Sequence, residues 1–273
     1  MPLPNLIIIG AMKCGTTSLH FQLRRHPQIA MPLDKELNFF VAERNWTKGV
    51  EWYASRFPAG TRIRGESSPS YSWLPQFAGV PARMHSVIPD ARLVYMVRDP
   101  VERLISHWVQ NFAEGTEPEP LAVAMRKEGY LSRSRYWTQV SAYLEHYPPS
   151  RILVIEMEDL AQDRAATLRK VFAFLDVDPE VALPDLRLNR SDRKRVKTRA
   201  GAWIERSPLG RGIDALPQWL EWKAERYLYW PFSRRIERPA LSGRDRAELA
   251  ELLREDANRF REFAGREFAD WCV

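Results

Sequence analysis

Residues 6–27, LIIIGAMKCGTTSLHFQLRRHP, carry two glycines, a lysine and three hydroxyl side chains directly after an apolar run. A strand that turns through glycines into a helix binds anions, because unpaired backbone N–H groups and the helix dipole point at the ligand. Gly10 and Gly15 have P-loop spacing, but Thr16 stands where that motif has its lysine, and Lys13 lies between the glycines instead. The pattern predicts a phosphate site. A tight turn with an exposed lysine is the alternative that the glycine pair alone leaves open.

A second junction of this kind lies at residues 92–108, RLVYMVRDPVERLISHW. Arg98 ends an apolar run, Pro100 suits the first turn of a helix, and Ser106 follows within that helix. Because parallel strands bring their carboxyl ends to one sheet edge, we expect Arg98 and Ser106 to hold a second phosphate. A salt bridge at the helix start is the alternative role for Arg98.

The elements that must position these residues form an α/β pattern. Apolar runs rich in Ile, Leu and Val predict buried parallel strands at 6–9, 93–97 and 152–155, and 61–70 gives a fourth that ends at Glu66. Alternation of such strands with helices predicts a central parallel sheet flanked by helices. A length of 273 residues fits a single domain over 1–273.

The C-terminal region predicts one long amphipathic helix, capped at Ser242 and ended by Gly265. The side chains expected to face the core are Leu249, Leu252, Leu253, Phe260 and Phe263.

The net charge of +6 is concentrated in one segment. Residues 187–199 hold seven basic residues and one acidic residue, so the rest of the chain balances at 34 against 34 (41 − 7 and 35 − 1). This favours one local anionic partner over a nucleic-acid track. A solvated basic loop is the alternative.

Two further features bear on the compartment. The longest apolar run is far short of the ~20 residues of a membrane helix, and it lacks the flanks of a signal peptide. Cys14 and Cys272 allow one disulfide at most, which fits a reducing compartment. We therefore expect a cytoplasmic protein without a membrane anchor; the oligomeric state stays open.

These motifs resemble those of sulfotransferases that use 3′-phosphoadenosine 5′-phosphosulfate (PAPS). KCGTTSL is similar to their 5′-phosphosulfate loop, and RDPVERLISHW to their 3′-phosphate motif. DKELNFF at 34–40 resembles a segment of the heparan-sulfate N- and 3-O-sulfotransferases and of bacterial relatives. GESSPSY, EMEDL and the C-terminal pattern extend the likeness over most of the chain. The resemblance implies a P-loop-like three-layer fold, PAPS as co-substrate, 3′-phosphoadenosine 5′-phosphate (PAP) as product, and no metal.

The resemblance also implies roles for single residues. Lys13 is expected beside the oxygen that bridges phosphate and sulfate, where negative charge grows as the bond breaks. Arg98 and Ser106 are expected on the 3′-phosphate. By the same likeness, the donor loop comprises Lys13, Cys14, Gly15, Thr16, Thr17 and Ser18.

Glu36 is the general base that the resemblance implies, taking the proton of the attacking acceptor. The LNFF that follows suggests a dry aromatic pocket that raises its pKa. From pattern alone, a surface pair of Lys35 with Glu36 is the alternative. A histidine base is a competitor, but neither His20 nor His107 falls on the position of such a base, and we expect both to be structural.

The basic segment resembles a late loop that closes over the nucleotide in relatives, which makes Arg193, Lys194 and Arg195 candidate donor contacts. Two departures limit the likeness. Ser67 stands where the heparan enzymes have a lysine, and Cys272 lacks the disulfide partner of the lumenal enzymes. A bacterial-type enzyme fits better.

The expected acceptor is a small-molecule or glycan hydroxyl, with an amine less favoured. Aromatic residues at 39–46, 71–77 and 135–137 are candidates for its pocket. Two other classes stay open. One is a P-loop kinase or NTPase with Glu156 and Asp159 as Mg²⁺ ligands. The other is a non-catalytic polyanion- or RNA-binding module that works through the basic segment.

Overall fold

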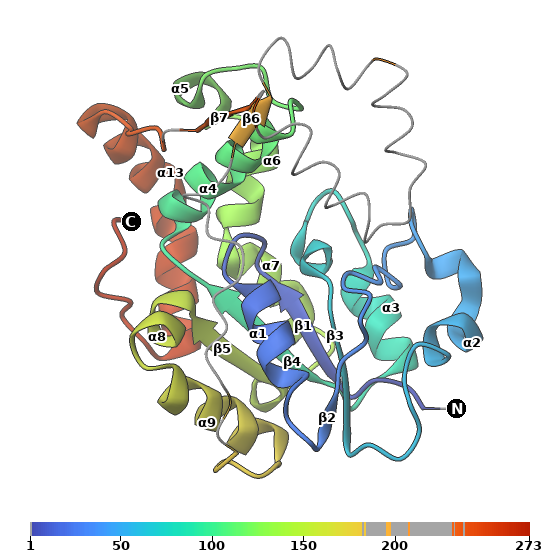
Figure 1. The fold of residues 1–273 in the computed structure, drawn as a ribbon. Helices are drawn as coiled ribbons and strands as arrows, with labels where there is room; N and C mark the ends of the chain where they lie inside the picture. The colour runs from blue at the N-terminus through green and yellow to red at the C-terminus, as the bar shows by residue number, and fades with distance from the viewer. Residues whose placement is uncertain are drawn as a thin grey trace.

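The structure is a computed structural model that describes residues 2–181, 183, 195–197, 207, 231, 233–236 and 238–273. Its centre is a parallel sheet in the order β2-β3-β1-β4-β5, flanked by helices (Figure 1). This confirms the predicted fold class. The strands are β1 (Leu6–Gly10), β2 (Ile29–Ala30), β3 (Ile63–Ser67), β4 (Arg92–Val97) and β5 (Ile152–Glu156).

The central strand β1 is buried along its whole length, because it has a neighbour on each side and helices above and below. Leu6 is in register with Gly65 of β3 and with Arg92 of β4. The four predicted strands are confirmed; β3 runs one residue past Glu66, and the short β2 was not predicted.

Helices lie on both faces of the sheet (Figure 1). On one face His26, which follows α1, packs against α9: its ring centroid lies 4.6 Å from that of Phe172. On the other face α7 packs against α13, with Tyr136 5.5 Å from Phe260 between ring centroids. The helices are α1 (Thr16–Leu23), α2 (Gly49–Ala54), α3 (Val80–Val87), α4 (Pro100–Ala113), α5 (Leu121–Ala124), α6 (Glu128–Leu131), α7 (Tyr136–Leu144), α8 (Met157–Gln162), α9 (Arg164–Leu175) and α13 (Gly243–Ala264), with 3-10 turns η1 (Trp46–Lys48), η2 (Pro69–Ser72), η3 (Ser132–Ser134) and η4 (Pro149–Arg151).

The C-terminal helix α13 has the predicted ends. The Ser242 hydroxyl accepts the backbone N–H of Asp245, and Gly265 ends the helix in the left-handed conformation. The prediction for Leu252 is wrong, because this side chain is 46% exposed. It precedes the buried Leu253 by one residue, which places it about 100° around the helix from the core-facing side.

The basic segment is described only in part. Arg195–Lys197 form β6, which pairs antiparallel with β7 (Ser233–Arg235). Only the backbone of Arg195 is described, and Arg193 and Lys194 lie outside the described residues. Their expected contacts with the donor therefore stay predictions. Within the described ranges, no helix has the length and apolar character that a membrane crossing requires.

Candidate active site

The loop after β1 is held close to its neighbours. The Ala11 N–H donates to the Met96 carbonyl of β4 at 2.6 Å. A Cβ on Gly10 would lie 2.0 Å from Ser72 Oγ, so any larger residue there would force its neighbours to shift. Gly15 adopts a φ of 84°, a left-handed conformation that glycine tolerates best.

Gly15 is the N-cap residue of α1. Glycine has no side chain to accept hydrogen bonds from the first N–H groups of the helix, and no side-chain cap is present. Thr16 is buried at the first position of α1, and Thr17 and Ser18 are half-buried beside it. The predicted loop residues thus form a helix N-terminus suited to an anion.

The side chain of Cys14 belongs to the core rather than to this surface. It is fully buried, with Sγ 3.6 Å from the Tyr136 hydroxyl. Burial raises the pKa of the thiol to about 11, so it stays protonated at neutral pH. Only the backbone of Cys14 is therefore available to contact a ligand of the loop.

Lys13 connects the two predicted phosphate sites. Its Nζ donates to Gln110 Oε1 at 2.8 Å, and Gln110 lies on α4, the helix that follows β4. Ser106 is one helical turn before Gln110 and is buried. The structure therefore brings the lysine loop and the Arg98–Ser106 junction to the same sheet edge. Gln110 was not predicted, although its spacing of four from Ser106 places both on one helix face.

Arg98 follows β4 directly, and its side chain is only 11% exposed. Its Nε lies 3.9 Å from Glu158 Oε1 and makes no hydrogen bond within the described structure. Among the described residues, the salt bridge that is the alternative role for Arg98 takes the form of this long contact with a residue of α8. A buried guanidinium N–H without an acceptor suits an anionic ligand. Glu158 was missed, although EMEDL directly follows a strand that ends at this edge.

The segment with Glu36 docks on the end of β3, next to β1. The Glu36 N–H donates to the Ser67 carbonyl at 3.1 Å. Glu36 and Asn38 have φ values of 66° and 49°, unusual for residues other than glycine. Non-glycine residues at such angles mark places where surrounding structure imposes the conformation.

The expected dry pocket around Glu36 is wrong. The side chain is 50% exposed, and Oε1 pairs with Lys35 Nζ at 2.8 Å, the partner that pattern alone favours. The Lys35 side chain is itself only 13% exposed, so the pair is not fully at the surface. Phe39 and Phe40 are fully buried, and Phe39 stacks on Tyr53 at 4.2 Å. The chain turns inward after Asn38, so both rings fill the core instead of lining an acceptor pocket.

Two histidines near the site are held neutral. Burial lowers the pKa of His20 to about 4, and its Nε2 lies 3.0 Å from the Pro32 carbonyl. Burial, aided by Arg103 and Arg133, lowers the pKa of His107 to about 2. Both fit the structural role expected for them.

Among the predicted acceptor segments, 71–77 contributes an aromatic ring with charged neighbours. Trp73 is half-buried and stacks on Phe77, with ring centroids 5.7 Å apart. The Arg133 guanidinium lies 4.0 Å from the Trp73 ring, and its Nη1 lies 3.0 Å from His107 Nε2. In segment 135–137, Trp137 instead packs on α13, against Phe263.

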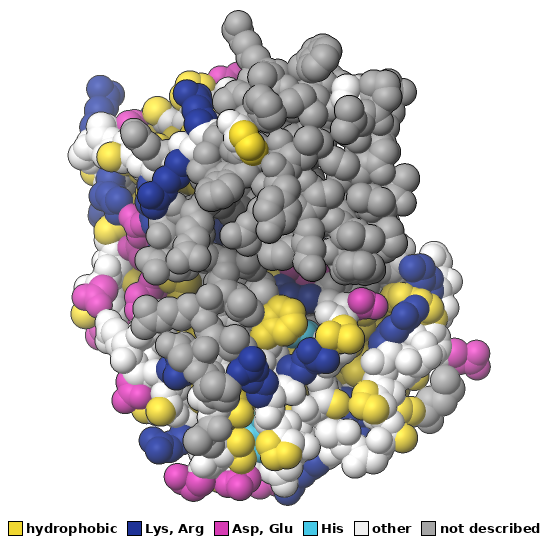
Figure 2. Space-filling view, in the orientation of Figure 1, with side chains coloured by type: hydrophobic (Ala, Val, Ile, Leu, Met, Phe, Trp, Pro, Cys, Tyr) yellow, Lys and Arg dark blue, Asp and Glu magenta, His cyan; other side chains and the backbone are white. Residues whose placement is uncertain are grey.

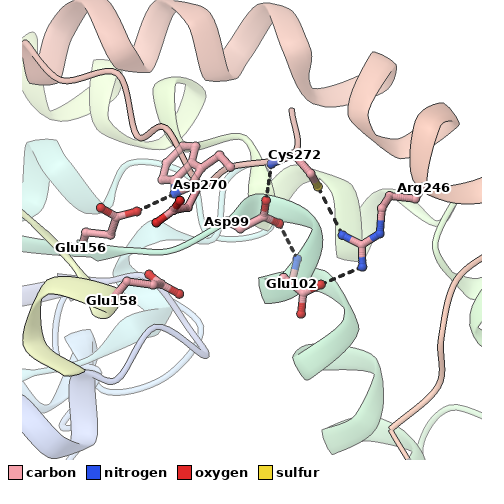
Figure 3. A pocket seen from close by; sticks show the side chains of 8 residues that line it. Asp99, Glu102, Glu156, Glu158, Arg246, Asp270 and Cys272 are labelled. Carbon is pink, nitrogen blue, oxygen red and sulfur yellow. Dashed lines mark hydrogen bonds and ion pairs between the residues drawn. The ribbon is translucent and has the colours of Figure 1, made fainter. Parts of the chain in front are cut away.

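A cavity of about 250 Å³ lies between α4, α8 and the C-terminal tail (Figure 3). Asp99 closes one side, accepting from the backbone N–H groups of Glu102 at 2.8 Å and Cys272 at 2.6 Å. The lining residues are Asp99, Glu102, Glu156, Glu158, Arg246, Asp270, Trp271 and Cys272.

The carboxylates proposed as Mg²⁺ ligands have other partners. Arg266 forms ion pairs with both Glu156 and Asp159, and Trp271 Nε1 donates to Glu156 Oε1 at 2.8 Å. Across the described ranges, no group of His, Cys, Asp and Glu is arranged to hold a metal ion. The kinase interpretation thus lacks support from this edge of the sheet.

The surface is of mixed character where it is described. On the face shown in Figure 2, Lys and Arg side chains lie among hydrophobic ones and do not form one continuous basic track. An extended nucleic-acid surface is therefore not evident on the described part of this face.

The fold and site define a class: a P-loop-like α/β protein with a lysine-bearing loop after its central strand and an arginine directly after the neighbouring strand. Residues 3–200 match the family model for the sulfotransferase domain. The chain belongs to the sulfotransferase family, as the sequence motifs predicted.

Similar proteins include larger enzymes. The chain is 34% identical over 185 residues to mouse heparan sulfate glucosamine 3-O-sulfotransferase 3B1, covering 63% of this chain and 46% of the relative. It is 30% identical over 200 residues to the Caenorhabditis briggsae bifunctional heparan sulfate N-deacetylase/N-sulfotransferase 1, covering 64% and 23%. The match thus spans less than half the length of these relatives.

Solved structures share the fold. A sulfotransferase from Alicyclobacillus acidocaldarius superimposes with a TM-score of 0.73 at 23% identity, covering 100% of both chains. Mouse sulfotransferase SULT7A1, complexed with PAP, gives a TM-score of 0.52 at 17% identity, covering 97% of this chain and 90% of the other. The cytoplasmic location stays a prediction.

Proposed function

We propose that this chain transfers a sulfuryl group from PAPS to a hydroxyl of a small-molecule or glycan acceptor, with an amine as the less favoured acceptor. The observation that carries the proposal is the Lys13–Gln110 hydrogen bond of 2.8 Å, because it joins the lysine loop to the helix that bears Ser106. Family membership, heparan-sulfate sulfotransferases among the relatives and a PAP-bound structural neighbour support the choice of donor.

Two features of the site fit the donor. The N-terminus of α1, capped only by a glycine, suits the 5′-phosphate, with Thr16, Thr17 and Ser18 supplying hydroxyls. The buried Arg98 Nε lacks a hydrogen-bond acceptor in the described structure, and a 3′-phosphate oxygen would supply one.

In the proposed reaction the acceptor oxygen attacks sulfur in line with the leaving group. The new oxygen–sulfur bond forms as the bond from sulfur to the bridging oxygen breaks, and that electron pair remains on the 5′-phosphate of PAP. Lys13 stabilises the growing charge on the bridging oxygen, which lowers the barrier more than it strengthens binding of PAPS. Glu36 takes the acceptor proton, and its half-exposed carboxylate is accessible for this role.

Calorimetric titration with PAP, 5′-AMP and ATP, without magnesium, tests the donor site. We expect one-to-one binding with a higher affinity for PAP than for 5′-AMP or ATP. The Lys13→Ala and Arg98→Ala variants should bind PAP more weakly than wild type. Arg259→Ala is a matched control, because Arg259 pairs with Glu255 on the exposed side of α13. Equal affinity for PAP and 5′-AMP would exclude the proposed donor.

A second experiment separates binding from chemistry. Glu36→Gln is expected to keep the PAP affinity and to lose all but a residual turnover of PAPS with a panel of alcohols, phenols and sugars. If Glu36→Gln turns over at the wild-type rate, Glu36 is not the base.

A further inference from the structure

A fully buried carboxylate, Glu66, lies on β3 next to Ser67, whose carbonyl accepts the Glu36 N–H. The Tyr53 and Tyr71 hydroxyls both donate to its Oε1 at 2.6 Å, and the Ser68 hydroxyl donates to its Oε2 at 2.9 Å. Burial raises the pKa of Glu66, and these three hydrogen bonds act in the opposite direction. The reaction proposed above makes no direct use of Glu66.

Two of these hydroxyls also contact the Glu36 segment. Ser68 Oγ accepts the Asn38 N–H at 3.0 Å, and the Tyr71 hydroxyl accepts the Phe40 N–H at 3.4 Å. A hydroxyl has one proton to donate and lone pairs to accept with. Because each hydroxyl donates its hydrogen bond to Glu66, its oxygen lone pairs are left to accept from the two backbone amides. The carboxylate thereby fixes the direction of both contacts.

The same segment carries the unusual backbone angles. Glu36 and Asn38 are both left-handed, and the Asn38 side chain donates to the Glu36 carbonyl at 2.6 Å. A left-handed conformation is unfavourable for residues with a Cβ, so anchors on both sides are needed to hold it. The Ser67 carbonyl anchors Glu36, and the two oriented hydroxyls anchor Asn38 and Phe40.

We propose that Glu66 is a positioning residue for Glu36: through Ser68 and Tyr71 it holds the segment that aims the general base at the acceptor. This inference rests on the proposed role of Glu36. Glu66 touches neither donor nor acceptor in this role, because its carboxylate is enclosed by hydroxyl groups.

Glu66→Gln tests the proposal, because a carboxamide keeps one acceptor oxygen and replaces the other by an NH2 donor. It can no longer accept hydrogen bonds from Ser68 and Tyr71 on two separate oxygens. We expect kcat to fall tenfold to a hundredfold, as an order of magnitude, with PAP affinity unchanged, since a small misplacement of a reacting group has effects of this size. Amide hydrogen exchange at Asn38 and Phe40 should become faster.

The matched control is Tyr53→Phe. The Tyr53 hydroxyl donates to the same oxygen, Glu66 Oε1, but makes no hydrogen bond to residues 36–40 in the described structure. Its removal should leave amide exchange at positions 38 and 40 close to wild type. Ser68→Ala serves as the second test variant if Glu66→Gln fails to fold, and it should expose the Asn38 amide selectively.

The double variant Glu36→Gln/Glu66→Gln shows whether Glu66 acts through Glu36. If it does, the second substitution lowers kcat no further. Unchanged amide exchange in Glu66→Gln and Ser68→Ala overturns the positioning role. If Glu66→Gln exchanges faster but Glu36→Gln keeps wild-type activity, the positioning contacts stand and Glu36 is refuted as the base. The two measurements therefore distinguish failure of the positioning contacts from failure of the proposed function.

Discussion

Replacing Gly10 by alanine tests how closely the loop after β1 must pack. The new Cβ would lie 2.0 Å from Ser72 Oγ and 3.1 Å from both Ser72 Cβ and Tyr95 Cε2. Tyr95 is fully buried and Ser72 Oγ donates to the Pro69 carbonyl, so neither side chain moves aside easily. Overpacking of this kind lowers the free energy of unfolding by about 1–3 kcal/mol.

Urea denaturation of Gly10→Ala and calorimetry with PAP measure the two expected effects. The shifted loop should weaken PAP binding by about tenfold, which corresponds to ~1.4 kcal/mol. Gly129→Ala is the matched control, because nothing lies within 4 Å of a Cβ at that position. Because Gly129 lies in α6, alanine there should not lower the stability and should raise it by up to about 1 kcal/mol.

The double variant Gly10→Ala/Ser72→Ala refines this test. It removes the 2.0 Å contact and keeps both 3.1 Å contacts. We expect partial recovery, with a coupling free energy on the order of 1 kcal/mol. Wild-type stability of Gly10→Ala, or no coupling with Ser72→Ala, would refute the reasoning from close packing.

Two further predictions concern stability. The unfolded chain binds protons at His20 and His107 below pH ~6.5, whereas the folded pKa values are about 4 and about 2. Stability should therefore fall by about 1–2 kcal/mol per histidine between pH 7 and 5, and His107→Gln should reduce this slope in urea titrations; a slope unchanged by the substitution would contradict it. Arg266→Ala removes the ion-pair partner of the buried Glu156 and leaves it the Trp271 hydrogen bond. It should cost about 1–2 kcal/mol because Arg266 is itself part-exposed, whereas exposed Arg259→Ala should cost under about 0.5 kcal/mol. Equal melting temperatures for the two arginine variants would argue against the Arg266 contacts.

Local features of the chain were sufficient for four strands of the central sheet and for the ends of α13. Apolar runs identify β1, β4 and β5 because strands buried on both faces need no polar alternation. Ser242 and Gly265 mark helix ends through contacts within a few residues. The motif around Lys13 is likewise contiguous, and its type and spacing pointed to the family before any contact was known.

Only the tertiary structure decided which side chains meet across long separations. Lys13 and Gln110 are 97 residues apart, and Arg266 and Glu156 are 110 apart. Such partners depend on which strands are neighbours, and a single sequence carries no local signal for that. The same holds for the Phe39–Phe40 pair, which aromatic content alone suggested for the acceptor pocket but which the turn after Asn38 directs into the core. The sequence by itself thus determined most of the elements and the family, whereas packing determined burial, partners and the setting of Glu36.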